Sequence, residues 1–586
     1  MQLFRAFVSS VLAASLTMLP VPAQADYGRG PRHEIHHVLL ISIDGMHSVD
    51  FINCSKGISG VNGGEPYCPN LAELAETGVN YLDTSTSNPS DSFPGLMAIV
   101  SGGSPRTVGA FYDIAYDRTY NGPVIATGNG FPGTGAAGCP SEPTGYSTEF
   151  DEGIDLNESA LNGGAPAGLD GGEQSIDPLK LDRDPANGCA PVYPWDFVRT
   201  NTIFGVLHNA GLYTAWTDKH PSYSSVSGHG SGGKAVDDYY SPEINSTVVA
   251  LPGVTTPAGM PCSPIPDTSS GATAAWTDSF QNIQCYDTLK VNAILNEING
   301  KNHAGTAKAP RPALFGMNFQ VVSVGEKLIE KKLGLTGGYV DAIGTPTASL
   351  LGEIEYVDEA IGEFVAALKS NGIYDDTLIV ITAKHGQSPV DSSHYQGISI
   401  FAGDPITTSP VTILDFTFGC IPVPEDEGPG PTEDDVSLIW LNSSCTTTQA
   451  VGDLEKTSPT SNNIAGIGEI FAGPNLVTYF NAPGLPPLDP RTPDILVTPN
   501  VGVTYSGSGK KLAEHGGFSR DDTNVIMLVS NPSLEPKTVY SPVEAMQVAP
   551  TILAALGFDP DELESVRTEH TSVLPGLPFY DGDGGH

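Results

Sequence analysis

The sequence predicts an α/β protein with a mostly parallel central sheet, helices on both faces of that sheet, and long loop-rich insertions. Continuous apolar runs bounded by turn residues recur along the chain, and such runs suit strands that are covered on both faces. Helical patterns of apolar residues lie between these runs. Because strands that alternate with helices favour parallel pairing, we expect one open, mostly parallel sheet.

The expected elements follow one another in a regular order. Strands are predicted at residues 38–43, 212–216, 313–322, 378–382, 494–498 and 524–530. Helices are predicted at residues 70–77, 93–100, 196–210, 286–298, 347–369 and 543–556. The helix at 347–369 has the clearest pattern, because its apolar residues fall on one stripe: Leu351, Ile354, Ile361, Val365 and Leu368.

Three segments interrupt this alternation, at about residues 114–190, 221–284 and 395–490. They are rich in Gly, Pro, Ser, Asn and Asp, so we expect loops or a cap over the functional edge of the sheet. We therefore predict a single domain over residues 26–586 that carries these segments as insertions.

The first 25 residues have the layout of a cleavable secretory signal. An early arginine is followed by an apolar stretch and by the small-residue exit Ala23-Gln24-Ala25. A membrane anchor is the alternative, but prolines interrupt the run. No later stretch is long and apolar enough to span a bilayer. We expect a secreted protein, extracellular or periplasmic, that is not held in a membrane.

The chain is strongly acidic, with 67 Asp and Glu residues against 27 Lys and Arg residues and a net charge of −40. Proteins that bind nucleic-acid duplexes or anionic membranes need a basic surface that displaces counterions, so the composition argues against both partners. A small anionic ester would need a local positive centre, from a metal ion or from a few cationic side chains.

Eight cysteines form an even set in a chain with a secretory signal, which favours disulfide bonds over zinc thiolates. No Cys-x-x-Cys pair occurs. Pairing of nearest neighbours would join four loop regions, but the sequence alone does not choose among the possible connectivities.

Polar residues follow several of the predicted strands. Asp44 comes directly after the first strand, and Lys384 and His385 follow the strand at 378–382. Ser92 precedes Phe-Pro-Gly at a predicted helix start, where backbone N–H groups favour an anion, and His515 lies in a glycine turn. Each residue alone has an ordinary explanation, such as an Asp-Gly turn, a helix cap or a surface histidine. Since ligands of open α/β sheets bind beyond the carboxyl ends of the strands, together they indicate one site.

The strand at 212–216 is also followed by charged residues. The segment "TAWTDKHPSY" places Asp218, Lys219 and His220 at the same expected edge of the sheet. Lys219 is predicted to bind an anionic group of a substrate. His220 is predicted to act as an acid, a base or a replacement metal ligand. The alternative is a solvated turn.

The segments "VLLISIDG", "SDSFPGLMAIVSGGSP", "LIVITAKHG", "AEHGGF" and "VAPTILAALGF", in this order, resemble the alkaline phosphatase superfamily. Within it, they are similar to the type I phosphodiesterase/nucleotide pyrophosphatase branch. The resemblance implies an alkaline phosphatase-like fold and Ser92 as the nucleophile. It also implies a divalent metal, zinc being the expected ion, held by Asp44, Ser92, His385 and His515.

Two positions depart from the family pattern. Lys384 stands where the family has the aspartate of Asp-His-Gly. After the strand at 313–322 the family has an aspartate and, four residues on, a histidine, whereas this chain has Gln320 and Val324, with Asp341 as a candidate substitute. Because an ammonium group replaces a carboxylate ligand, we expect one bound ion rather than two.

Lys384 is itself a candidate catalytic residue. It could take the place of one metal's charge, by holding a phosphoryl oxygen or by lowering the pKa of Ser92. The alternative is that Lys384 turns to an acidic neighbour.

These residues predict a secreted, metal-dependent hydrolase of phosphodiesters or phosphomonoesters. Ser92 would attack phosphorus, and water would then hydrolyse the covalent phosphoryl-serine. The segment around Lys219 is also similar to the lysine-bearing segment with which phosphonoacetate hydrolases of this superfamily hold a substrate carboxylate. The alternatives are a phosphonate or sulfate ester hydrolase and, since two ligand positions are replaced, a non-catalytic binding protein.

Overall fold

The computed structural model describes residues 34–579 apart from several internal segments. The segments that are not described are 128–132, 134–138, 140–142, 150–152, 264–274, 399–408, 418, 422–431, 462–465, 483–488 and 507–510. The expected signal segment, residues 1–25, lies outside the described residues. Within the described part of the chain, no helix combines the length and the apolar character that crossing a bilayer requires.

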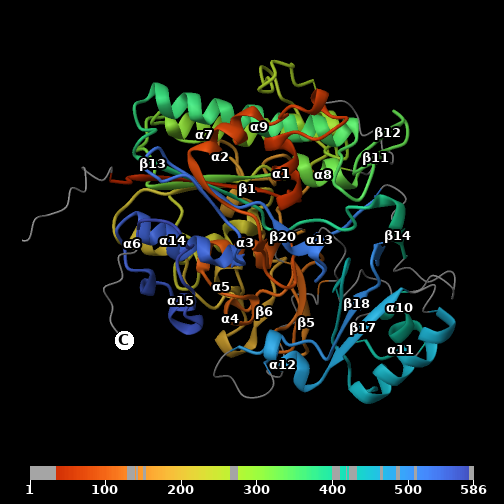
Figure 1. Ribbon diagram of the computed structural model, residues 1–586. Coiled ribbons are helices and arrows are strands. Elements are labelled where there is room, and N and C mark those ends of the chain that lie inside the picture. Colours follow the sequence, from red (N-terminus) through yellow and green to blue (C-terminus); the bar gives the residue numbers. More distant parts are fainter. Residues whose placement is uncertain are drawn as a thin grey trace, which may run out of the picture. The chain divides into compact units, whose positions relative to one another are not determined.

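An eight-stranded sheet forms the centre of the structure (Figure 1). Its strands, in spatial order, are β22 (Lys537–Val539), β2 (Gly78–Tyr81), β21 (Leu528–Ser530), β13 (Thr377–Thr382), β1 (His37–Ile43), β10 (Leu314–Phe319), β8 (Ala215–Thr217) and β9 (Asp238–Tyr240). The strands from β13 to β9 are parallel to one another, whereas β21 is antiparallel to both of its neighbours. The predicted fold class is confirmed.

Helices cover both faces of this sheet (Figure 1). Side chains alternate along β1: Val38 and Leu40 pack in one apolar cluster, whereas Leu39 and Ile41 pack in another on the opposite face. The first cluster includes residues of α3 (Ser92–Ser101), α6 (Ile203–Asn209) and α14 (Val548–Ala555). The second includes residues of α2 (Pro69–Glu76), α7 (Phe280–Ile298) and α9 (Ala348–Ser370). Burial on both faces explains the uninterrupted apolar runs of the sequence.

Two predicted helices differ from the expectation. The segment 196–210 forms two short helices, α5 (Pro194–Phe197) and α6, and α6 begins after Thr202, whose side chain caps it. The segment 543–556 begins as a short strand, β23 (Val543–Glu544), and only its second half is the helix α14. Other helices lie near the carboxyl edge of the sheet or in loops: α1 (Ser48–Lys56), α4 (Pro105–Val108), α8 (Val321–Lys327), α13 (Arg520–Thr523) and α15 (Glu564–Glu569).

A second, antiparallel sheet is built largely from the segment 395–490. It consists of β15 (Thr432–Glu433), β16 (Ser437–Ile439), β18 (Ile495–Pro499) and β17 (Ile467–Ala472), with α11 (Thr447–Ser461) and α12 (Pro474–Phe480) beside it. The strand predicted at 494–498 is β18, so it lies in this sheet and not in the central one. Ile495 and Val497 pack on one face of it and Leu496 on the other, which is why its sequence is as apolar as that of a central strand.

The eight cysteines pair as sequence neighbours, and the disulfides that were predicted are therefore present. The bonds are Cys54–Cys68, Cys139–Cys189, Cys262–Cys285 and Cys420–Cys445.

Glu433 of the smaller sheet gives the stability of the protein a pH dependence. It is buried, and its Oε1 accepts hydrogen bonds from Ser437 Oγ at 2.6 Å and from Val411 N at 3.0 Å. Burial raises the pKa of Glu433 from 4.5 to about 7. The neutral carboxyl is favoured by folding, so its contribution is complete below pH 4.5 and is lost as the pH rises through about 7.

We therefore expect Glu433→Gln to lose less stability than the wild type between about pH 5 and about pH 8, by on the order of 2 kcal/mol. Urea titrations of both proteins at several pH values measure this. Parallel pH profiles for the two proteins would contradict it.

Candidate functional site

Four parallel strands end at one edge of the central sheet, and chemically active residues follow them. In-register pairing of β1 with β10 and with β13 aligns their ends, and β8 pairs with β10. The residues that follow are Asp218 after β8, Gln320 after β10, Asp44 after β1, and Lys384 and His385 after β13.

Ser92 is the first residue of α3 and lies at this edge. Asp91 caps the helix, because its Oδ2 accepts a hydrogen bond from Phe93 N at 3.3 Å, so Ser92 is not the capping residue. The hydroxyl of Ser92 contacts two side chains instead. Lys219 Nζ donates to Ser92 Oγ at 3.0 Å, and His385 Nε2 lies 3.1 Å from the same oxygen.

Gly95 allows the start of α3 to approach the backbone of Lys384. A Cβ atom at Gly95 would lie 2.1 Å from Lys384 O, so a larger residue does not fit there. Thr86 Oγ1 donates to the same carbonyl at 2.5 Å. The Phe-Pro-Gly sequence after Ser92 thus brings the serine close to the residues that follow β13.

Asp44 is a fully buried carboxylate enclosed by hydrogen-bond donors. Its Oδ1 accepts from Asn318 Nδ2 at 2.7 Å and its Oδ2 accepts from Gln320 Nε2 at 2.6 Å. The Nζ atoms of Lys384 and Lys219 each lie 4.0 Å from Oδ2. Burial by itself raises the pKa of Asp44, but these neighbouring cations hold it well below its usual range.

Lys384 is fully buried and pairs with an acidic neighbour. Its Nζ donates to both carboxylate oxygens of Asp218, at 2.8 Å and 3.1 Å, and lies 4.2 Å from the ring centre of Tyr223. Burial lowers the pKa of Lys384, and Asp218 and Asp44 oppose that shift. Lys384 therefore turns to an acidic neighbour, which was the alternative to a catalytic role, and its charge also lies 4.0 Å from Asp44 Oδ2.

The hydrogen bonds of His385 define its tautomer. Nδ1 lies 2.8 Å from Gly386 O, and a carbonyl oxygen only accepts, so Nδ1 carries the proton. In the neutral ring Nε2 is then an acceptor, and the hydroxyl of Ser92 donates to it. Nε2 also lies 3.7 Å from Asp44 Oδ2.

His515 stacks near His385, with 3.9 Å between the ring centres, and its Nδ1 lies 3.3 Å from Asp91 Oδ1. Burial holds the pKa of His515 well below its usual range, and the positive charges of Lys327 and Lys219 add to that shift. The other residues that the resemblance implies as metal ligands thus lie close to His385: Asp44, Ser92 and His515.

The two predicted substrate-binding residues differ in their surroundings. Lys219 faces Ser92, and 13% of its side chain is exposed. His220 is buried, and its Nδ1 lies 2.9 Å from Glu243 Oε1. Ser92 itself is fully buried, whereas 11% of the side chain of His515 is exposed. The exposed parts of the site are therefore the side chains of Lys219 and His515.

The contacts of Asp341 give no support to it as a substitute ligand, and two residues of the site were not predicted from the sequence. Asp341 lies in an exposed turn, where its Oδ1 accepts from the backbone N–H groups of residues 343 and 345. Asn318 and Asp91 were not singled out. Asn318 could have been predicted as a polar residue near the end of an apolar run, and Asp91 as an acid directly before Ser92.

The side chains around Asp44 do not fit a divalent ion. Both carboxylate oxygens already accept from amides, and two ammonium groups lie 4.0 Å from Oδ2. An ion bound to a carboxylate lies about 2 Å from the oxygen. For a separation of about 4 Å between a divalent ion and an ammonium group, the repulsion is roughly 8 kcal/mol at an effective dielectric constant of about 20. Gln320 and Val324 supply no anionic or imidazole ligand in compensation.

Another group of side chains does have the composition of a metal site. His47, Asp50 and Glu326 are buried and offer ligand atoms that lie within 4.8 Å of one another. His47 Nδ1 lies 2.9 Å from Asp50 Oδ2 and 3.2 Å from Glu326 Oε1. Burial raises the pKa of Glu326 to about 7. These side chains could hold a cation or, as they stand, pair with one another.

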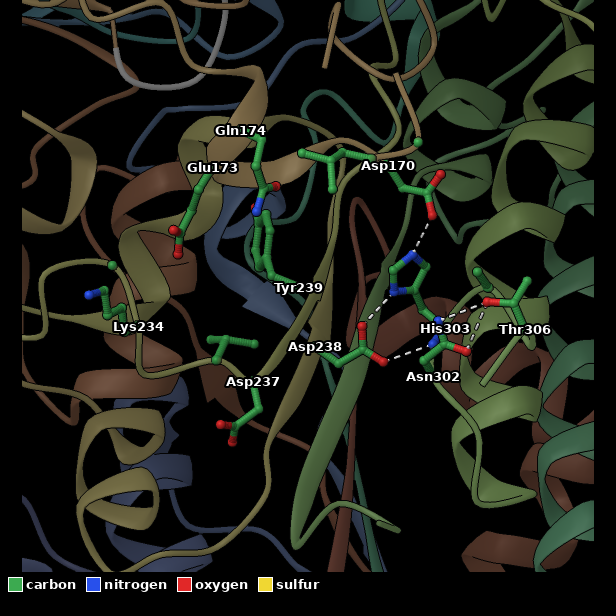
Figure 2. A pocket seen from close by; sticks show the side chains of 15 residues that line it. Asp170, Glu173, Gln174, Lys234, Asp237, Asp238, Tyr239, Asn302, His303 and Thr306 are labelled. Atoms are coloured by element: carbon green, nitrogen blue, oxygen red, sulfur yellow. Dashed lines mark hydrogen bonds and ion pairs between the residues drawn. The ribbon is translucent and has the colours of Figure 1, made fainter. Parts of the chain in front are cut away.

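An open hollow of about 830 Å³ lies along β9, and no residue of the Ser92 site lines it (Figure 2). His303 bridges two of its acids, with Nδ1 2.5 Å from Asp238 Oδ1 and Nε2 2.9 Å from Asp170 Oδ2 (Figure 2). Because both ring nitrogens face carboxylates of the protein, we assign no chemistry to this hollow.

Two family models match the chain. The model of type I phosphodiesterase / nucleotide pyrophosphatase matches residues 38–131 and 341–518, and the sulfatase model matches residues 199–411. The first match contains Asp44, Ser92, Lys384, His385 and His515, and the second contains Lys219. No curated protein sequence matches the chain.

Solved structures are similar to the chain in fold. Alkaline phosphatase PafA is 13% identical, with a TM-score of 0.51 over 90% of this chain and 97% of that one. Murine ectonucleotide pyrophosphatase / phosphodiesterase 5 is 13% identical, with a TM-score of 0.47 over 89% and 96% of the two chains. Its human counterpart is 12% identical, with a TM-score of 0.46 over 89% and 95%. At these identities the similarity to PafA concerns the fold alone.

Lys384→Met should lower the free energy of unfolding by about 3–5 kcal/mol, because it leaves buried carboxylates without their cation. The double variant Lys384→Met/Asp218→Asn should recover part of that loss, since it removes both members of the closest pair. Urea unfolding of both variants at neutral pH measures the difference. A single variant as stable as the wild type would show that the ion pair does not stabilise the fold.

Proposed function

This chain belongs to the alkaline phosphatase superfamily and is similar to its type I phosphodiesterase/nucleotide pyrophosphatase branch, and on that premise we propose that it hydrolyses small phosphate esters with Ser92 as the nucleophile. Phosphodiesters and phosphomonoesters are the proposed substrates. One observation carries the proposal: Ser92 Oγ lies at the start of α3 between a hydrogen-bond acceptor, His385 Nε2, and a cation, Lys219 Nζ.

In the proposed reaction, the hydroxyl of Ser92 gives up its proton, which passes to solvent, and Oγ forms a bond to phosphorus while the bond between phosphorus and the leaving oxygen breaks. The leaving oxygen keeps the electron pair of that bond and takes a proton from solvent. Water then attacks the phosphoryl-serine and loses a proton to solvent, the bond from phosphorus to Oγ breaks, and Oγ takes up a proton that restores the serine hydroxyl. Lys219 and the N–H groups at the start of α3 would stabilise the charge on the phosphoryl oxygens.

Lys384 and His220 have supporting roles in this proposal. Lys384, held by Asp218, keeps a positive charge 4.0 Å from Asp44 and so adds to the positive field at the site. His220, held by Glu243, follows Lys219 directly and is a candidate for binding the rest of the substrate.

A zinc ion held by Asp44, Ser92, His385 and His515, which the resemblance implies, stays a prediction. The amide and ammonium groups around Asp44 do not fit a divalent ion, so none of the reaction steps above involves one. Should the protein use a cation, the group His47, Asp50 and Glu326 has the composition to hold one.

Secretion to the extracellular space or the periplasm is part of the proposal. Four disulfide bonds support it, because such bonds persist in oxidising compartments.

Two other functions stay open. The match to the sulfatase model favours a sulfate ester as an alternative substrate, and a phosphonate would need the same cationic contacts. A non-catalytic binding protein is favoured by the replaced ligand positions and by the full burial of Ser92.

Ser92→Ala should lower the turnover of bis-p-nitrophenyl phosphate or p-nitrophenyl phosphate by at least about 1,000-fold, because it removes the atom that attacks phosphorus. Ser92→Thr, which keeps the hydroxyl, is the matched control and should retain measurable turnover. Release of p-nitrophenolate is followed by absorbance. If folded wild-type protein turns over no phosphate, phosphonate or sulfate ester, with or without zinc or manganese, the binding-protein alternative replaces the proposal.

A further inference from the structure

We infer that Ser92 is activated without a divalent ion, with His385 as the acceptor of the serine proton and the ammonium group of Lys219 as the positive charge beside the resulting alkoxide. This inference rests on the proposed function, because it concerns the same nucleophile. It departs from what the resemblance implies, which is activation by a bound metal.

The proton acceptor is defined by two contacts of His385. The carbonyl oxygen of Gly386, 2.8 Å from Nδ1, holds the proton on that nitrogen. Nε2 is left as an acceptor 3.1 Å from Ser92 Oγ, which is the distance of a hydrogen bond. A backbone carbonyl that orients the histidine, which in turn orients the serine, provides the arrangement of a base-activated nucleophile.

The positive charge comes from Lys219. Its Nζ donates to Ser92 Oγ at 3.0 Å, so it stabilises the oxygen once the proton has left. Lys384 does not compete for this role, because both oxygens of Asp218 hold its ammonium group. In a metal-dependent member of the superfamily a bound ion would supply that charge.

The same side chains oppose an ion at this place. An ion that coordinated Asp44 Oδ2 would compete with the amide of Gln320 for that oxygen and would be repelled by two ammonium groups, each 4.0 Å from the oxygen. Lys219 and Lys384 therefore take the place of the metal charge, and His385 acts on the proton of Ser92 rather than on an ion.

Labelling of Ser92 by diisopropyl fluorophosphate tests the activation directly. The serine oxygen bonds to phosphorus, fluoride leaves with the electron pair, and the serine proton passes to His385 and then to solvent. We expect chelator-treated, full-length protein to form the adduct on the peptide that contains Ser92, as seen by mass spectrometry. His385→Gln, which cannot take up the proton, should slow labelling by at least about 100-fold.

Lys219 offers a matched pair of variants for the same assay. Lys219→Met should slow labelling, whereas Lys219→Arg, which keeps the charge, should restore most of the rate. Failure of the wild type to label in chelator, or labelling that appears only after zinc is added, would overturn the inference. Equal rates for the methionine and arginine variants would also overturn it.

Zinc content tests the absence of an ion at Asp44. The purified protein is treated with chelator, dialysed against zinc chloride, freed of excess metal and analysed by mass spectrometry. We expect Asp44→Asn to bind as much zinc as the wild type. Any zinc that is bound by the wild type but not by Glu326→Gln belongs to the group His47, Asp50 and Glu326, and such a result agrees with the inference. The triple variant Gln320→Asp/Val324→His/Lys384→Asp restores the family residues and should gain zinc. Stoichiometric zinc that disappears in Asp44→Asn would overturn the inference.

The two proposals fail in different ways. Suppose that chelator abolishes ester turnover, that zinc restores it, and that Asp44→Asn no longer binds this zinc. That result would support the hydrolase and overturn metal-free activation. Ready labelling of Ser92 in chelator without turnover of any ester would uphold the activation and remove the proposed hydrolase function.

Discussion

The buried ion pairs among Asp44, Asp218, Lys384 and Lys219 set the geometry of the Ser92 site. A buried charge is costly unless a partner lies close, so each of these residues constrains the others. Lys384 is held by Asp218 at 2.8 Å and 3.1 Å, and its backbone carbonyl lies against Gly95 of α3. The position of the serine therefore depends on contacts with Lys384.

Lysine side chains at the site provide positive charge that a bound metal ion would otherwise supply for phosphoryl transfer. Phosphoryl transfer gains mostly from positioning and from positive charge around the phosphoryl oxygens. Ammonium groups can supply that charge, and an imidazole with a defined tautomer can accept a proton. A lysine and a glutamine at positions where the resemblance implies metal ligands are thus compatible with the proposed catalysis and equally with a protein that only binds.

The acidic surface makes the local cations more important. With a net charge of −40, the protein as a whole repels anions, and a few lysines at one edge of the sheet must overcome that field. Lys219 is the only one of the two site lysines with an exposed part, 13% of its side chain, whereas Lys384 has none. Of these two lysines, Lys219 is therefore the one that an anion from solvent can reach, and it lies beside Ser92.

The sequence by itself determined the fold class, most of the strands, and the residues that meet around His385, because apolar runs and strand-end polar residues are local patterns that a parallel sheet brings to one edge. It did not determine that β18 belongs to a separate sheet, because a strand buried on both faces has the same composition in either sheet. Nor did it determine that Lys384 pairs with Asp218, that Asn318 and Gln320 enclose Asp44, or that Asp341 lies in an exposed turn. Those outcomes depend on distances between residues far apart in the chain, and only the tertiary structure fixes such distances.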